Sequence, residues 1–354
     1  DDLQLSGAAV AALGRIGTAE AAAALKEFHS QAPESKQDVV VSAILEAAEQ
    51  LVKAGDCGAA NQLYDWLATQ PAEAVGAAVY RGRVRAARRA AGALEHARLI
   101  IDGLRNERSS LFCVAADCLR GTRDPETIQI VAAAVPEFPT HGKAAALDSL
   151  RGCTLPAVRA AALQCLDAAD SDVRVAALRS LIDAGTPSDL SRLLKLARTT
   201  NDLQVQQAVT ETVRLMSAAG TDSALLDWMI AAPTLDPLVV RTAFARRSPI
   251  LLPAFLHAAE SPDAAIRLEA FRALEVMATN DNVVALVDLL CKSVPGEERE
   301  AAGRAVWMSC QMIPDPDRRC EPLLKAFQEA DVAGQCAVLP TLARLGTAGS
   351  LAAI

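Results

Sequence analysis

The chain has 354 residues, of which 51% are hydrophobic and only 3% aromatic, and its formal net charge is −8. This negative balance argues against nucleic acid or an anionic membrane as the main partner, because both attract basic surfaces. No apolar run approaches the roughly 20 residues that cross a bilayer, and the first residues lack the charged-then-apolar order of a signal peptide.

The first predicted helix ends in a leucine-glycine turn that recurs at the far end of the chain. Residues 13–19 (LGRIGTA) return as residues 342–348 (LARLGTA), and residues 63–67 (LYDWL) return as residues 225–229 (LLDWM). Both offsets are close to multiples of about 33 residues, a period typical of helical-pair repeats. We therefore expect one unit to be repeated as a single array over residues 1–354.

The turn itself also recurs along the chain. A leucine stands four residues before a Gly-Thr or Gly-Asp pair at Leu13, Leu51, Leu181 and Leu342, with a close variant at Leu215. Glycine can adopt the left-handed backbone that closes a helix, and the Thr or Asp that follows can cap the next helix. Each site therefore predicts a turn between two helices.

A basic stripe is predicted on a helix at 72–91. At about 100° per residue, four arginines share one face of this helix beside an apolar face. The arginines are Arg81, Arg85, Arg88 and Arg89, and the apolar face holds Val75, Val79, Ala86 and Ala90. Guanidinium groups suit phosphates and carboxylates, which makes the stripe a possible site for a ligand or partner. The alternative is a solvated face whose arginines pair with acids such as Glu73, Glu95 and Asp102.

Further along, small and apolar residues recur at helical spacing and predict a helix near 173–184. They are Val173, Ala176, Ala177, Ser180, Leu181 and Ala184. Leu178 and Ile182 add apolar side chains on a second side. This helix is therefore expected to pack against both its own partner and the next repeat.

Residues 170–181 (DSDVRVAALRSL) and 261–274 (SPDAAIRLEAFRAL) resemble the second helix of HEAT repeats, and residues 236–243 are a looser copy. The resemblance implies an all-α fold, an α-α superhelix formed as a right-handed solenoid of about ten HEAT-like pairs. It also implies that the second helices line the concave face. In HEAT proteins the motif Asp and Arg commonly bond between neighbouring repeats. This assigns structural inter-repeat roles to Asp172, Arg174, Asp263 and Arg267.

Both ends of the chain are apolar, at 3–13 and 345–354, where a terminal repeat usually shows a polar outer face. The chain is therefore expected to be a fragment of a larger protein.

The sequence offers no convergent set of catalytic groups. Its four histidines, His29, His96, His141 and His257, fall in different repeats and are expected at the surface or at helix ends. The nine cysteines form no C-x-x-C pair, and no Walker, G-x-S-x-G or H-E-x-x-H motif is present. No catalytic, cofactor-binding or metal-binding residue is predicted.

Two sets of residues have a local interpretation. Cys310 and Cys320 flank a proline turn at similar distances, so a disulfide stays open while free thiols are favoured. Trp66 and Trp228 occupy equivalent repeat positions, and Trp307 lies between apolar neighbours. Core packing is the favoured interpretation for all three tryptophans.

The leading function is a non-catalytic binding or scaffold module that presents a concave helical surface to a protein or peptide, or an accessory domain of a larger protein. The alternative is binding of a phosphate-rich ligand or nucleic acid through the arginine stripe. A remote alternative is enzymatic, because the motif also resembles the HEAT-like repeats of phycobilisome lyases, which attach pigments at cysteines. No residue here matches a catalytic motif of that family.

Overall fold

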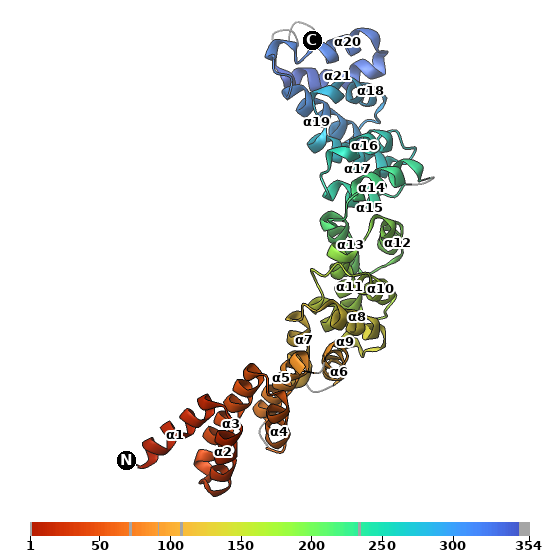
Figure 1. Cartoon of the computed structure of the whole chain (residues 1–354). Coiled ribbons are helices and arrows are strands. Elements are labelled where there is room, and N and C mark those ends of the chain that lie inside the picture. Colours follow the sequence, from red (N-terminus) through yellow and green to blue (C-terminus); the bar gives the residue numbers. More distant parts are fainter. Residues whose placement is uncertain (1, 71–72, 91, 107–108, 233–234, 347–354) are drawn as a thin grey trace. The chain divides into compact units, whose positions relative to one another are not determined.

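The structure is a computed structural model in which all regular elements of the described residues are helices (Figure 1). The described ranges are 2–70, 73–90, 92–106, 109–232 and 235–346. No helix within them is long and apolar enough to cross a membrane. Contacts divide the chain into two compact units, Asp1–Ala184 (unit 1) and Gly185–Ile354 (unit 2).

Unit 1 contains helices α1 to α11 and one 3₁₀ helix, η1. Their bounds are α1 (Asp2–Ile16), α2 (Ala19–Gln31), α3 (Glu34–Ala54), α4 (Cys57–Leu67), α5 (Glu73–Ala90), α6 (Gly92–Leu104), α7 (Ser109–Arg120), α8 (Pro125–Ala134), η1 (Val135–Glu137), α9 (Thr140–Ser149), α10 (Pro156–Cys165) and α11 (Ser171–Ala184).

Unit 2 contains helices α12 to α21 and the 3₁₀ helices η2 to η5. Their bounds are η2 (Pro187–Asp189), α12 (Leu190–Thr199), α13 (Leu203–Leu215), α14 (Thr221–Ala231), α15 (Pro237–Ala245), η3 (Pro249–Leu251), α16 (Leu252–Ala258), α17 (Ala264–Met277), η4 (Asn280–Asn282), α18 (Val283–Lys292), α19 (Glu297–Gln311), η5 (Pro316–Arg318), α20 (Glu321–Glu329) and α21 (Val332–Leu345).

The helices alternate between two rows within each unit. Even-numbered helices are called first helices here and odd-numbered ones second helices. In unit 1 the second helices α1, α3, α5, α7, α9 and α11 pack each on the next, as do the first helices α6, α8 and α10. In unit 2 the second helices α13, α15, α17, α19 and α21 do the same. Both units are therefore stacks of HEAT-like helical pairs, and the predicted all-α class is confirmed.

The predicted apolar stripe on α11 explains why these helices need neighbours. All six of its residues are buried, and Leu178, on the second side, is fully buried as well. Ile182, expected beside it, is half-buried. Alanine dominates this packing, because its small side chain lets helix backbones approach closely while leucine and valine fill the remaining space.

The predicted turns form as expected at several positions. Gly17, Gly55, Gly220 and Gly346 take the left-handed backbone, with φ of 62°, 95°, 82° and 63°. After Gly17, the Thr18 side chain accepts a bond from Ala21 N at 3.2 Å and caps α2. Gly17, Gly55 and Gly346 thus follow the ends of α1, α3 and α21, whereas Gly220 lies five residues after the end of α13 and is the N-cap of α14.

The prediction that the three tryptophans lie in the core is wrong in degree, because Trp66, Trp228 and Trp307 are each half-buried. Trp66 is partly buried against the core and makes a T-shaped contact with the His29 ring, at 5.0 Å between centroids. The Trp307 ring lies under the Arg344 guanidinium, 4.3 Å from its carbon. These rings therefore cover helix edges rather than fill the interior.

Candidate functional site

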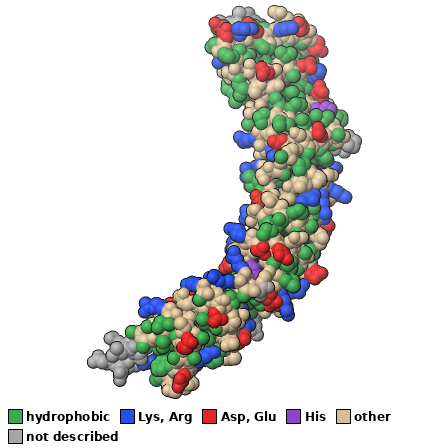
Figure 2. All heavy atoms as spheres, viewed as in Figure 1, with side chains coloured by type: hydrophobic (Ala, Val, Ile, Leu, Met, Phe, Trp, Pro, Cys, Tyr) green, Lys and Arg blue, Asp and Glu red, His purple; other side chains and the backbone are tan. Residues whose placement is uncertain are grey.

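The arginine stripe lies on α5, a second helix of unit 1. All four of its arginines are exposed, and Val79 and Ala86 on the neighbouring face are buried as predicted. Ala90 is exposed instead of buried, because α5 ends there. Figure 2 shows Lys and Arg side chains following the edge of unit 1 where α5 and α7 lie.

Ion pairs neutralise only part of the positive charge of this stripe. Arg85 Nη1 lies 3.2 Å from Glu49 Oε1 on α3. The expected partner Glu95 instead lies 3.8 Å from Arg98. The side chain of Glu73, another expected partner, is outside the described part of the structure. Among the described side chains, Arg85 is the one member of the stripe with a carboxylate partner.

Three arginines of the stripe converge on one hollow. Arg81, Arg85 and Arg88 line a cavity of about 240 Å³ next to α7, whereas Arg89 does not. The other lining residues are Val84, His96, Asp117, Cys118, Gly121 and Thr122. Asp117 pairs with Arg120 at 3.0 Å. The hollow is therefore positively charged overall, and we call it the α5–α7 hollow.

His96 contributes to this hollow from α6 and corrects the expectation of a surface histidine. It is only 3% exposed, and its Nδ1 lies 3.3 Å from Thr127 Oγ1. Burial, and then the charge of Arg88, lowers the pKa of His96. The signal in the sequence was its spacing with Ile100 and Leu104, which puts His96 on the buried face of α6.

The cysteines in the part of the chain that the structure describes are unbonded, and several of them are buried. No group of His, Cys, Asp and Glu side chains there could hold a metal ion. Burial raises the pKa of Cys118, and raises that of Cys310 to about 11, with a smaller contribution from Cys320. Thiols with raised pKa values are poor nucleophiles at neutral pH. Cys310 and Cys320 are both buried and unbonded, which agrees with the favoured interpretation.

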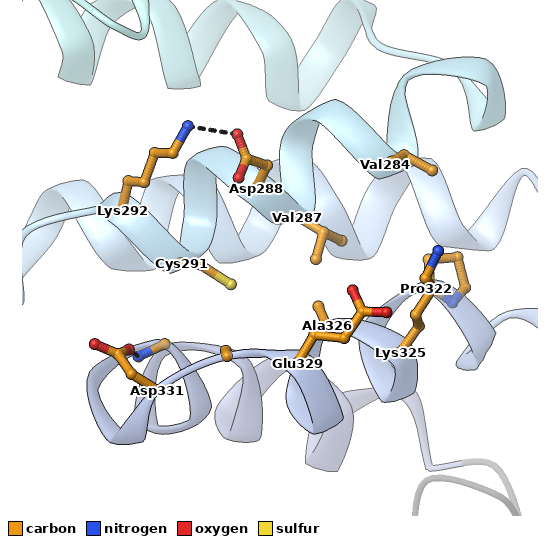
Figure 3. A pocket seen from close by; sticks show the side chains of 12 residues that line it. Val284, Val287, Asp288, Cys291, Lys292, Pro322, Lys325, Ala326, Glu329 and Asp331 are labelled. Carbon is orange, nitrogen blue, oxygen red and sulfur yellow. Dashed lines mark hydrogen bonds and ion pairs between the residues drawn. The ribbon is translucent and has the colours of Figure 1, made fainter.

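A larger groove lies in unit 2 between the first helices α18 and α20 (Figure 3). Its volume is about 650 Å³, within the usual size of ligand sites. Val287 and Cys291 of α18 face Ala326 of α20 across it, and Ala330 also lines it. Val284 stands at its edge with 76% of its surface exposed. The small alanines leave this space open. We call it the α18–α20 groove.

Charged side chains stand along the edges of the α18–α20 groove (Figure 3). Lys292 Nζ and Asp288 Oδ2 pair with each other at 2.6 Å, so their charges offset. Lys325, Glu329 and Asp331 remain, and their sum is one negative charge. Sequence reasoning missed this groove, because it forms between helices that are separated by α19 in the chain.

The motif residues of the HEAT resemblance have distinct structural contacts. Arg174 and Arg267 each donate to two carbonyls five and six residues earlier, at 2.8–2.9 Å, and so close the turn inside their own pair. Arg267 also reaches the next repeat, where Nη2 lies 2.7 Å from Glu298 Oε2. Asp263 caps α17, and Asp172 is exposed.

Arg246, which the sequence did not single out, joins neighbouring repeats in unit 2. It lies at the end of α15 and pairs with Asp222 of α14, with only 12% of its side chain exposed. Its Nη1 also donates to carbonyls at the end of α13, including Met216 O at 3.1 Å. A buried guanidinium here donates to carbonyl oxygens at a helix C-terminus that would otherwise lack donors.

No protein-family model matches this sequence, and no curated protein does either. Among solved structures, an engineered protein aligns with 98% of this chain and 91% of its own, at 19% identity and a TM-score of 0.34. A structure of Kap95p with RanGDP aligns with 97% of this chain and 51% of its own, at 15% identity and a TM-score of 0.40. Importin beta aligns with 92% of this chain and 52% of its own, at 10% identity and a TM-score of 0.41. The chain thus spans about half the length of the latter two proteins. Sequence identities and TM-scores this low indicate no more than a general likeness of fold.

Proposed function

We propose that this stack of HEAT-like pairs is a binding module that holds a segment of a protein or peptide partner and has no catalytic role of its own. The observation that carries the proposal is the α18–α20 groove, which combines an apolar floor with charged edges. Apolar area supplies affinity in such a groove, and the edge charges orient the bound segment.

A peptide segment fits this groove better than a small polar metabolite. The groove runs along two helices, and its floor is formed by aliphatic side chains such as Val287 and Ala326. An amphipathic helix can place its apolar residues on such a floor and keep its polar face in water. The net negative charge of the unpaired edge residues favours a segment that carries a basic residue.

Selection of peptides on the intact chain tests this proposal. Peptides selected from a displayed library on the unaltered chain should bind the Val284→Glu variant at least about tenfold more weakly, since one lost apolar anchor is worth about 1.5–3 kcal/mol. Leu203→Glu is the matched control, because Leu203 is 72% exposed on α13 of the same unit. Selected peptides that bind both variants like the unaltered chain would contradict the proposal.

A second candidate function is binding of a phosphate-rich ligand through the arginine stripe. It is supported by the convergence of Arg81, Arg85 and Arg88 on the α5–α7 hollow. Guanidinium groups gathered around one small cavity can share the oxygens of a single phosphate. The three arginines come from one helix, so their spacing is set by the backbone of α5 rather than by a loop.

Retention on heparin tests this second candidate. Arg81→Gln with Arg88→Gln should elute at clearly lower salt, because heparin is a polyanion and each lost arginine contact weakens its salt-dependent binding. These two arginines are suitable because Arg85 keeps its partner Glu49 in the variant. Arg179→Gln, an exposed arginine of α11, is the control. Equal elution of both variants and the unaltered chain would refute the candidate.

A further inference from the structure

A second arginine hollow lies in unit 2, between the second helices α19 and α21. Its volume is about 440 Å³. Arg299 and Arg304 line it from α19, and Arg344 and Thr341 line it from α21. It is separate from both sites described above, because it shares no lining residue with the α18–α20 groove or the α5–α7 hollow. We call it the α19–α21 hollow.

Each of its three guanidinium groups is held by a contact outside the binding space. Arg299 Nη2 donates to Ser293 O at 2.6 Å, and Arg304 Nε donates to Glu275 Oε2 at 3.0 Å. Arg344 stacks on the Trp307 ring at 4.3 Å. Arginine has five N–H donors, so one such contact fixes the group and leaves other donors for a ligand. Arginines fixed in this way lose little freedom when they bind.

The floor of the hollow adds a hydroxyl group. Thr341 is only 5% exposed and lines the cavity. Gly303, which faces it from α19, keeps this space open, because a Cβ there would lie 2.9 Å from Thr341 Oγ1. A hydroxyl can donate to an anion that the arginines hold, so four side chains offer donors to one small volume.

The surrounding charge selects for a single anionic group rather than a polyanion. Glu300 lines the same hollow, whereas Glu297 and Glu298 in the same first turn of α19 are paired with Arg272 and Arg267. The Glu300 carboxylate repels the continuous phosphate backbone of a nucleic acid, which needs a longer basic track. A phosphorylated side chain brings about two charges and three acceptor oxygens to one point.

We propose that the α19–α21 hollow binds the phosphoryl group of a phosphorylated segment in a protein partner. Three preorganised guanidinium groups and one hydroxyl match the three acceptor oxygens of a phosphomonoester. The carboxylate of an unmodified Asp or Glu offers two oxygens and one charge, and it would leave donors of the hollow unused. The site thus distinguishes the modified partner from the unmodified one.

Binding of the intact chain to a degenerate phosphoserine peptide library, compared with the same library unphosphorylated, tests the proposal. We expect at least tenfold stronger binding of the phosphorylated library and competition by inorganic phosphate. Arg344→Gln and Gly303→Ala should each reduce binding at least tenfold. Arg318→Gln, an exposed arginine in η5 of the same unit, should leave it unchanged.

Three results would overturn the proposal. They are equal binding of the two libraries, phosphopeptide binding that survives both Arg344→Gln and Gly303→Ala, and duplex DNA that competes through Arg344 more strongly than the phosphopeptides do. Circular dichroism of each variant shows whether its helices are retained. Because Arg344 is exposed, its replacement is expected to leave the fold intact. Failure here would leave the Val284 and Arg81 tests unaffected, since those residues lie elsewhere.

Discussion

At the scale of single residues, close backbone contact between repeats depends on particular glycines. Gly142 of α9 is buried, and a Cβ added there would lie 2.5 Å from the carbonyl oxygen of Leu104 at the end of α6. A backbone oxygen has little freedom to move away. Gly142 therefore determines how closely two neighbouring pairs approach in unit 1.

Gly142→Ala should destabilise unit 1 by about 1–3 kcal/mol, since overpacking forces backbone shifts. A change of 1 kcal/mol moves the melting temperature of a domain this size by roughly 2–4 °C, which circular dichroism resolves. Gly76→Ala on α5 is the control, because nothing lies within 4 Å of its added Cβ. That control should be neutral or stabilising by up to about 1 kcal/mol. Equal melting temperatures for both variants would contradict the packing argument.

His96 gives unit 1 a pH-dependent stability. Burial lowers its pKa below 6.5 in the folded chain, so the unfolded chain takes up a proton first as the pH falls. Stability contributed by neutral His96 is complete above pH 6.5 and decreases as the pH falls toward the lowered folded-state pKa. His96→Gln should therefore reduce the loss of melting temperature between pH 7.5 and about 5. His257→Gln, at an exposed site on α16, should not, and an equal effect of both variants would refute the assignment.

At the scale of elements, polar side chains near the start of the second helices close the turn inside each helical pair. The position four residues after the Asp that precedes the second helix lets Arg174 and Arg267 reach carbonyls in the turn between the two helices of their own pair. Gln206 of α13 makes the same contact with Thr200 O at 3.0 Å. The motif therefore specifies a closed turn inside each pair. Contacts to the next repeat depend on which residue the neighbouring helix supplies.

The Arg267–Glu298 pair joins α17 to α19, and the exposed fractions of its side chains are only 17% and 10%. A double-mutant cycle with Arg267→Met and Glu298→Gln should give a coupling energy of about 1–3 kcal/mol, because a partly buried pair is little screened by water. The Lys292–Asp288 pair is 62% and 61% exposed and serves as the control. Its coupling should be about 0.5 kcal/mol or less. Similar couplings for both pairs would show that burial does not strengthen the inter-repeat contact.

At the scale of the whole molecule, stability is local, because each helical pair contacts only its neighbours. Residues 1–184 and 185–354 each have their own internal core. The single continuous array expected from the sequence stays a prediction. This prediction can be tested by measuring whether the two units unfold together.

Each unit, expressed alone, should keep its helices and unfold cooperatively. If the chain acts as one array, the intact protein should unfold in a sharper transition than either unit, since coupled repeats share one transition. Circular dichroism melts of the three proteins measure this. Intact-chain melts that equal the sum of the separate units would refute the single array, and an unfolded fragment would refute local stability.

The helical class, the turns and the second-helix motif could be predicted from the sequence, because they follow from local chemistry. Apolar spacing on α11 and left-handed glycines such as Gly17 act within a few residues of the chain. The sequence also placed the arginine stripe on one face of α5. The sites themselves depend on the tertiary structure. Arg344 meets Trp307, and Ala326 faces Val287, only because helices distant in sequence pack side by side. A helical period fixes the face on which a residue lies, but the packing between repeats decides whether that face closes or leaves a hollow.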